Sequence, residues 1–553
     1  MKKALSSPYV QAVLFMLAGG VVSALLQYEV LWDYANYHYY NGFAFLNGRL
    51  TRDIAPATIL TYFNPLADAA LFWLGERLDS FPAIYHFVTG LPYGALMYVV
   101  FLLTKPLSES LLCRLIAVAV AGTGAAVFSQ IGTASHEIFV ALLVLSAVLL
   151  LMNEMFVNPR QRGLPFFWAG LLTGTAAGFK ITAGMYCVSS TLCLLAFYKN
   201  MAKKQFLFFA LGGGAGFFAV NGFWMLTLWQ TFGNPVFPLF NGIFKSPYFP
   251  PVNYRETIYL ENRTALQTLL LPFILMIHFS ENFVGDFSFS DARFAFGFIA
   301  LIAALSAGKL KSVDKPFMFL IVWALISYLF WLFTSSVIRY AAAVEIVCGI
   351  CVVKALFAAF VRPPSPSYIA DALRLSTLVF GLMILCATPF LTTSWGTRRG
   401  GDFVSEFDAP ALPENTLVAL YGNPASVFLA KAAQKQPSVQ GIAFVQRYDN
   451  TPTNRYWDFA DKTLFGERRA EILKTHKGPR VAYIEHKRFY MEHPQKFVSE
   501  MTCADILRKT ADDKKPPVFP VAFVCWSKEL DALFPKGEPF ADYVRKRAER
   551  FGF

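Results

Sequence analysis

The sequence predicts a polytopic α-helical membrane protein with about eleven transmembrane helices and a soluble C-terminal α/β domain. Of its 553 residues, 55% are hydrophobic and 16% are charged, whereas soluble domains carry about 25% charged residues. Long apolar runs fill the chain up to about residue 393, and short β-rich runs follow them. Lipid is therefore the solvent expected around most of this chain.

The lengths of the apolar runs identify the spans, because a helix needs about 20 apolar residues to cross roughly 30 Å of hydrocarbon. The first run, residues 10–31, follows Lys2 and Lys3 and includes Val22-Ser23-Ala24, which looks like a signal-peptide cleavage site. Its length favours an uncleaved helix instead. Further spans are predicted near residues 82–104, 111–129, 137–152, 164–179, 181–198, 205–230, 294–308, 316–334, 340–360 and 372–393.

The loops between these spans predict the topology, because cytoplasmic loops are enriched in Lys and Arg. With the N-terminus in the cytoplasm, every inner connection is basic. These connections carry Lys105, Arg114, Arg160, Arg162, Lys199, Lys203, Lys204, Lys309, Lys311, Lys315, Arg362 and Arg374. An odd number of spans places the residues after Thr393 outside. We therefore expect a multi-pass protein of the inner (plasma) membrane with a periplasmic or extracytoplasmic C-terminal domain.

The chain changes character after the last span, which divides it into a transmembrane domain of residues 1–393 and a domain of residues 394–553. Residues 394–401 form a linker that contains Gly and Arg. β-rich runs and helical runs then alternate, which is typical of a layered α/β domain. Strands are predicted at 416–421, 441–445, 480–485 and 521–526, and helices at 425–434 and 468–474.

Charge and cysteine usage exclude several kinds of partner. The net charge is +12, but the Lys and Arg residues form no basic stripe interleaved with aromatics, so we expect no nucleic acid. The eight cysteines lack the spacing of zinc or redox motifs. Cys503 and Cys525, in the C-terminal domain, can pair in an oxidising compartment, and the sequence leaves both their states open.

Ionisable residues gather in the first long outer loop, residues 32–80, and such residues mark functional sites in membrane proteins. Asp33 directly follows the first span among aromatic residues, so its carboxylate is a candidate general base. His38, Arg49 and Asp53 follow within about two dozen residues. An interfacial aromatic belt is the alternative interpretation, but it explains only the tyrosines.

A second group of charged residues lies at the outer ends of later spans. Glu137 begins the fourth span, and Lys180 lies in the outer turn between the fifth and sixth spans. A lone Lys at the membrane interface usually extends its ammonium group into water without binding a ligand. Here, however, Arg293 and Arg339 are also expected at this face. Two guanidinium groups and an ammonium suit a phosphate or pyrophosphate. Glu345 is expected to pair with a cation.

Glycines and prolines predict two further features. Gly170, Gly174 and Gly178 precede Lys180 at a spacing that lets helices pack closely. A second outer loop at residues 232–248 contains enough Pro and Gly to be a rigid segment beside the membrane. The apolar run 269–277 that follows is too short to cross, so an interfacial helix is expected there.

These features resemble the GT-C superfamily of membrane glycosyltransferases, which take a sugar from a polyprenyl-phosphate carrier at the outer membrane face. The resemblance is carried by Asp33 after the first span, the long first outer loop, residues 174–182, residues 233–238, Ser336-Val337-Ile338-Arg339-Tyr340 and the outer C-terminal domain. It covers the organisation of residues 1–393, which would form the catalytic domain. The C-terminal domain would be an accessory domain.

The resemblance implies a role for each candidate residue. Asp33 would be the catalytic base, with Glu137 and Asp53 as competing candidates. The donor-phosphate site would be formed by Lys180, Arg339, Arg293 and His38. No Asp-x-Asp motif follows the first span, so no cofactor is indicated, although a divalent metal is compatible with the chemistry.

The implied reaction is a direct displacement that inverts the anomeric centre. Its partners would be a polyprenyl-phosphate sugar donor, a glycan or lipid-linked acceptor, and membrane lipids. A flippase or transporter of lipid-linked sugars is the alternative, but it would need charges along a path through the bilayer, whereas the helix centres here are apolar. A glycan polymerase or ligase uses similar chemistry, and the sequence does not separate it.

Overall fold

In the computed structural model the chain forms two compact units, each built from three separate stretches of sequence. Unit 1 comprises residues 1–28, 86–222 and 256–399, and unit 2 comprises residues 29–85, 223–255 and 400–553. The structure describes residues 7–26, 28–30, 33–160, 162–197, 199, 203–253, 258–261, 263–277, 284, 289–306, 314–361, 368–391, 397–399, 411–421, 426–444, 463–484, 501–505 and 523–531.

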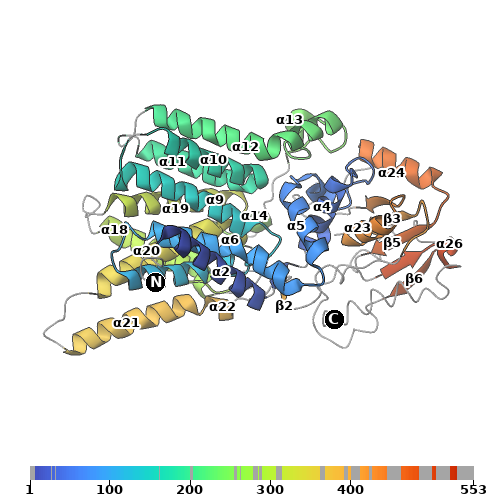
Figure 1. Ribbon diagram of the computed structural model, residues 1–553. Helices are drawn as coiled ribbons and strands as arrows, with labels where there is room; N and C mark the ends of the chain where they lie inside the picture. Colours follow the sequence, from blue (N-terminus) through green and yellow to red (C-terminus); the bar gives the residue numbers. More distant parts are fainter. Residues whose placement is uncertain are drawn as a thin grey trace. The chain divides into compact units, whose positions relative to one another are not determined.

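Unit 1 is a bundle of apolar helices (Figure 1). Its longer helices are α2 (Pro8–Leu26), α6 (Pro82–Leu103), α7 (Leu111–Gly122), α9 (Glu137–Met152), α10 (Leu164–Phe179), α11 (Gly184–Ala196), α12 (Lys203–Phe232), α18 (Arg293–Ser306), α19 (Lys315–Thr334), α20 (Ala342–Phe360) and α21 (Tyr368–Cys386). Each of these helices coincides with a predicted span, and α12 and α6 extend into the stretches assigned to unit 2.

Short elements connect the long helices of unit 1. They are α8 (Ala125–Phe128), η3 (Asn153–Val157), η4 (Ile181–Ala183), α14 (Ile258–Glu261), α15 (Ala265–Leu269), α16 (Leu271–Ile277), η7 (Ile338–Ala341), α22 (Thr388–Leu391), and the strands β1 (Tyr28–Val30) and β2 (Thr397–Arg399). Helix α16 confirms a short helix over residues 271–277 of the predicted run 269–277. Lys309, Lys311, Arg362 and most of the predicted linker 394–401 lie outside the described residues.

The helices have the lengths and composition of a polytopic membrane protein. Over the described residues, seven helical stretches are long and apolar enough to cross a membrane. They are α2, α6, residues 137–157, α12, α19, residues 338–360 and α21. Three of the remaining predicted spans are shorter apolar helices, at Leu111–Gly122, Leu164–Phe179 and Ile181–Ala196.

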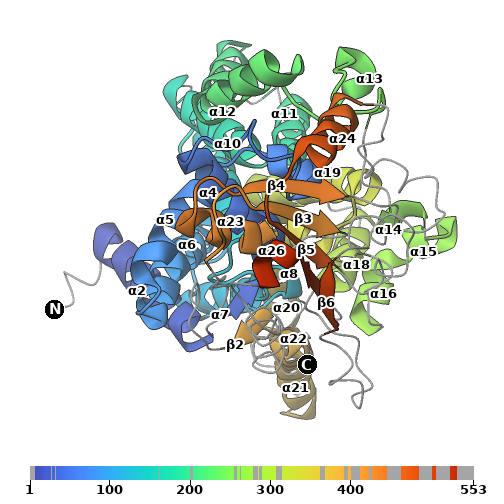
Figure 2. The same ribbon diagram turned by 90° about the vertical axis from the view of Figure 1, so that its right-hand side faces the viewer.

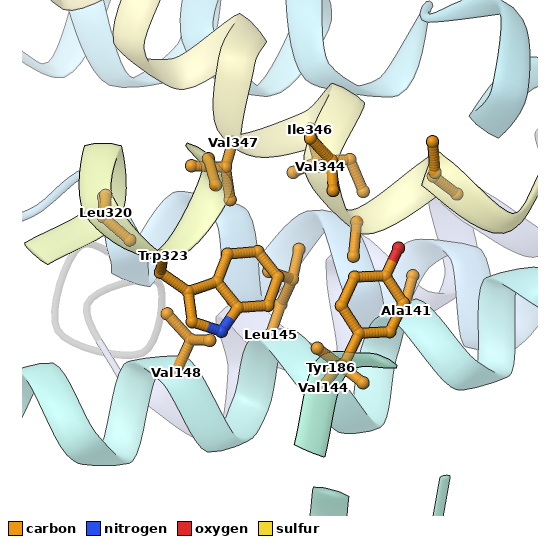
Figure 3. Close-up of a cluster of buried hydrophobic side chains, with 14 of the residues drawn as sticks. Ala141, Val144, Leu145, Val148, Tyr186, Leu320, Trp323, Val344, Ile346 and Val347 are labelled. Atoms are coloured by element: carbon orange, nitrogen blue, oxygen red, sulfur yellow. The ribbon is translucent and has the colours of Figure 1, made fainter. Parts of the chain in front are cut away.

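Helix α20 is the central helix of unit 1, since it contacts α7, α9, α18 and α19. Figure 3 shows the apolar side chains of α9, α19 and α20 meeting around Trp323 and Tyr186. These two rings are stacked, with centroids 5.6 Å apart and planes 11° apart. The Trp323 indole N–H donates to Ser190 Oγ over 3.0 Å, so the polar atom of this buried ring is satisfied.

The glycines of α10 allow it to pack closely on α12, as their spacing predicts. A Cβ atom on Gly174 would lie 2.0 Å from the carbonyl oxygen of Gly213, and one on Gly170 would lie 2.0 Å from that of Phe209. Backbone atoms of the two helices therefore occupy the space of a side chain. Close approach of this kind is a usual basis of helix association in membranes.

We expect Gly174→Val to destabilise the folded chain by about 1–3 kcal/mol, the usual cost of overpacking. The reason is that the backbone of α12 has to move away from α10. Gly214→Val is the matched control, because apart from the local backbone of α12 no heavy atom lies within 4 Å of the Cβ position there. Thermal unfolding of the detergent-solubilised protein measures both. Equal unfolding temperatures for the two variants would contradict the close packing.

Unit 2 contains a mixed five-stranded sheet in the order β4-β3-β5-β7-β6 (Figure 2). The strands are β3 (Leu417–Tyr421), β4 (Gln440–Phe444), β5 (Arg480–Ile484), β6 (Thr502–Asp505) and β7 (Phe523–Trp526). β3 pairs in parallel with β4 and β5, whereas β7 is antiparallel to β5 and β6. The associated helices are α23 (Ser426–Lys435), α24 (Leu464–Thr475) and α26 (Lys528–Asp531). Four strands, α23 and α24 confirm the predicted α/β pattern, whereas β6 and the short α26 were not predicted.

The first outer loop folds as part of unit 2 and contains its own helices. These are η1 (Tyr34–His38), α4 (Tyr39–Leu46), η2 (Thr58–Tyr62) and α5 (Leu66–Leu78), and the second outer loop adds α13 (Asn241–Phe244). Ile54 continues the sheet, because its backbone N–H donates to Gly441 O and its carbonyl accepts from Ala443 N. Residues 29–85 and 223–255 thus share a unit with the C-terminal residues, and the division into 1–393 and 394–553 stays a prediction.

Cys525 is disulfide-bonded, and Cys503 stands opposite it in the register of β6 and β7. The six cysteines of the helical unit are free thiols: Cys113, Cys187, Cys193, Cys348, Cys351 and Cys386. Their burial in or beside apolar helices agrees with a packing role.

Candidate active site

Lys180 and Glu137 meet at two helix ends of unit 1. Glu137 is the first residue of α9 and is 4% exposed, and Lys180 follows the last residue of α10. The Lys180 ammonium forms an ion pair with the Glu137 carboxylate and also donates to Ser135 O over 3.0 Å. Two of the predicted site residues are therefore in direct contact.

Arg339 joins this pair through the ring of Tyr340. Arg339 lies in η7, between α19 and α20, and its Cζ is 5.6 Å from the centroid of the Tyr340 ring. Lys180 Nζ is 5.0 Å from the same centroid. Two cations therefore share one aromatic ring, an arrangement that cation–π attraction stabilises. The Tyr186 hydroxyl donates to Tyr340 O over 2.6 Å, which holds the short η7 segment between α19 and α20 in place.

Arg263 is a further cation at this site, and the sequence reasoning missed it. Its Nη2 donates to Ser336 Oγ over 2.6 Å, three residues before Arg339. Its side chain is buried, with 8% of the residue exposed, and Nε and Nη1 have no partner among the described residues. No described carboxylate forms an ion pair with it. Its position just before the apolar run 269–277 was the signal that could have found it.

Burial lowers the pKa of the Arg263 guanidinium. Arginine pKa values exceed about 12, so the side chain keeps its charge at neutral pH. A buried charge is stable only when a counter-charge or hydrogen-bond acceptors compensate for its lost hydration. Arg263 therefore has unused capacity to bind an anion.

Arg293 lies in an internal network, which does not favour its predicted phosphate role. It is fully buried and forms an ion pair with Asp291 over 2.8 Å. Its remaining N–H groups donate to the carbonyls of Val120 and Leu385 and to the hydroxyls of two threonines, Thr123 and Thr388. All five N–H groups are occupied, so Arg293 holds the helices together.

Glu345 is close enough to Arg293 for their charges to interact, as expected of a paired acid, but its hydrogen bonds go to backbone groups. Its carboxylate accepts the backbone N–H groups of Ala126 and Val127 over 2.9 and 3.0 Å. These groups belong to the first turn of α8, where helix N–H groups lack internal partners. Glu345 therefore fixes a helix start.

Asp53 has a structural role in unit 2. Its carboxylate accepts two N–H groups of Arg49 at 2.7 and 2.8 Å, the hydroxyl of Tyr40 at 2.7 Å and the backbone N–H of Gly441 at 2.7 Å. Burial and the Asp53 charge raise the pKa of Tyr40 well above its usual value, so Tyr40 stays a neutral donor. These bonds fasten the first outer loop to β4 and leave Asp53 poorly suited to act as a base.

Asp33 and His38 stand at the two ends of η1. Asp33 is 1% exposed and immediately precedes this element, which is a π-helical turn, a feature frequent at functional sites. His38 Nδ1 and Asp68 Oδ1 are 2.7 Å apart, and both side chains are buried. The structure thus groups Glu137, Lys180 and Arg339 within unit 1, while Asp33 and His38 belong to unit 2.

The unit 1 cluster carries three cations, Arg263, Arg339 and Lys180, and among the described residues the Glu137 carboxylate forms an ion pair with Lys180. Arginine forks match phosphate oxygens, and an ammonium adds a point charge. The cluster is therefore suited to hold an anionic group such as a phosphate at breaks between apolar helices.

No protein-family model matches this sequence. No curated protein sequence is similar to it. The structure is similar to the crystal structure of ArnT from Cupriavidus metallidurans bound to undecaprenyl phosphate, with a TM-score of 0.48 and 12% sequence identity. The match covers 94% of this chain and 97% of that chain.

Proposed function

We propose that this chain is a membrane glycosyltransferase that moves a sugar from a polyprenyl-phosphate donor to a glycan or lipid-linked acceptor. The observation that carries the proposal is the buried guanidinium of Arg263, whose Nε and Nη1 have no partner in the described part of the chain. A phosphate beside Arg339 and Lys180 would supply the missing counter-charge. This ligand would also explain why three cations gather at breaks between apolar helices.

A small apolar hollow of about 60 Å³ lies among α16, α18, α19 and α20, and its lining includes Pro272, Phe294, Phe298 and Tyr328. Tyr328 is close enough to Arg263 to interact with the guanidinium charge. The cation therefore borders apolar surface, which favours a phosphate that carries a lipid over a free phosphate.

In the proposed reaction the acceptor hydroxyl oxygen attacks the anomeric carbon, and Asp33 takes the proton of that hydroxyl. The bond from the anomeric carbon to the phosphate oxygen breaks, and the lipid phosphate leaves with the electron pair. Arg263, Arg339 and Lys180 stabilise the charge that develops on the leaving phosphate. Glu137 keeps Lys180 in place through their ion pair. Inversion at the anomeric carbon follows from the single displacement.

The proposed orientation places unit 2 outside the cytoplasm. The basic residues of the predicted inner loops support this orientation. The disulfide of Cys525 supports it as well, since disulfides persist in oxidising compartments. A transporter would need polar groups along its path, and the core around Trp323 is apolar (Figure 3).

The test of the proposal is binding of a polyprenyl phosphate to the detergent-purified chain. Arg263→Gln removes a charged donor, and hydrogen bonds to charged groups contribute about 1.5–3 kcal/mol. We expect the dissociation constant to rise roughly tenfold to a hundredfold. Arg162→Gln is the control, because the Arg162 side chain is 57% exposed. Unchanged affinity in Arg263→Gln would remove this cation from the site and the main support from the proposal.

A further inference from the structure

Unit 2 contains a cleft that the proposed transfer reaction does not use. Its volume is about 550 Å³, within the range of small-molecule sites, roughly 300–1,000 Å³. The walls come from α4 and the turn after it, from α5, and from α23, which lie far apart in the sequence. The side chains that matter most are those of Asn47, Arg52, Glu76 and Gln434, with Phe43 and Phe72 beside them.

Two of the polar side chains are fixed by a shared network around Tyr39. Glu76 Oε1 accepts the Tyr39 hydroxyl over 2.6 Å and the Lys431 ammonium over 3.0 Å. Gln434 Nε2 donates to the same hydroxyl over 3.0 Å. Glu76 Oε2 and Gln434 Oε1 have no partner among the bonds of the described residues. Each side chain is therefore held at one atom and retains an acceptor for a ligand.

The other wall repeats this arrangement. Asn47 Nδ2 donates to Phe43 O over 2.8 Å, which leaves the Asn47 carbonyl oxygen as an acceptor. Arg52 Nη2 donates to Ser438 O over 2.7 Å, which leaves its Nε and Nη1 as donors. Side chains that the protein already fixes lose little entropy when a ligand binds. The cleft is thus a preformed set of acceptors and donors.

The balance of these groups selects the ligand chemistry. Arg49 pairs with Asp53 and Glu76 pairs with Lys431, so Arg52 is the one charge lining the cleft without an ion pair among the described residues, and a single such cation does not select a polyanion. A phosphate offers acceptors only, and three of the open groups are acceptors as well. A hydroxyl both donates and accepts, so a hydroxyl-rich ligand can use every group present. Phe43 and Phe72 also line the cleft, but they are 2% and 8% exposed, so the open polar groups dominate recognition.

We infer that this cleft binds a neutral oligosaccharide. The inference goes beyond the proposed function, because binding here requires neither the lipid donor nor a transfer step. A site of this kind would hold a glycan on unit 2 independently of the cations in unit 1.

An array of neutral and anionic oligosaccharides, probed with the labelled full-length protein, identifies the ligand, and calorimetric titration then measures its affinity. Asn47→Leu and Gln434→Leu each remove one open acceptor at nearly constant size, so each should weaken binding roughly two- to tenfold. Asn158→Leu, an exposed asparagine of unit 1, should bind as the wild type does. The unfolding temperature of each variant shows whether the fold is kept.

The inference is overturned if no neutral oligosaccharide binds, if only anionic ones bind, or if folded Asn47→Leu and Gln434→Leu both bind with wild-type affinity. Asp33→Asn separates this result from the transfer reaction. It should bind the same oligosaccharide normally, because Asp33 does not line the cleft. Loss of transfer with intact glycan binding would therefore concern only the proposed function.

Discussion

Asp33→Asn should transfer sugar at least about a hundredfold more slowly than the wild type while it folds and binds the lipid donor normally. A general base contributes about 10² to 10⁴ in rate, and an amide cannot accept the proton at neutral pH. The substitution keeps the size of a side chain that is 1% exposed. Transfer from a polyprenyl-phosphate sugar by the reconstituted protein, measured with donor binding, checks this expectation.

The amide variants of the competing acids provide the comparison. Asp53→Asn should mainly lower the stability of the fold. It removes the ion pair with Arg49 and weakens the hydrogen bond from Gly441 N–H that joins the first outer loop to β4. Glu137→Gln should mainly weaken donor binding, because Lys180 loses its ion pair. If Asp33→Asn transfers at nearly the normal rate and Glu137→Gln does not, the base is Glu137. If all three variants transfer normally, the proposed mechanism is wrong.

Arg293→Met should destabilise the helical unit by about 3–5 kcal/mol, the usual cost of breaking a buried ion pair from one side. The substitution leaves the Asp291 carboxylate buried with its charge uncompensated. It also removes the guanidinium N–H groups that donate hydrogen bonds to the carbonyls of Val120 and Leu385. Chemical unfolding in detergent measures the loss, and Arg160→Met, at an exposed position with no ion pair among the described residues, should change stability by less than about 1 kcal/mol.

The double variant Asp291→Leu/Arg293→Met distinguishes a buried ion pair from simple loss of packing. Removing both charges relieves the unpaired carboxylate, so the double variant should be more stable than Arg293→Met alone. The two residues would act independently if the double variant were less stable than the wild type by the sum of the losses measured for Asp291→Leu and Arg293→Met separately.

The sequence determined the helices of unit 1 and most strands of unit 2. Runs of about 20 apolar residues identify spans wherever they occur, because the bilayer sets the length of a helix independently of its neighbours. The strands β3, β4 and β5 were equally visible as short apolar runs. β6, with the sequence Thr502-Cys503-Ala504-Asp505, carries no such pattern, and it forms because β7 supplies its hydrogen-bond partners. Strand formation depends on pairing, which a local pattern reports only in part.

The sequence predicted the candidate site less completely than the helices, because it shows which residues are charged but not which groups contact them after folding. It identified Asp33 as the acid after the first span and Lys180 as a cation at a helix end, and the structure shows Lys180 paired with Glu137. Only the tertiary structure decided that Arg293 and Asp53 are used internally and that Arg263 keeps open donors. The physical reason is that the energy of a buried charge depends on the groups that surround it after folding, and those groups come from distant parts of the chain.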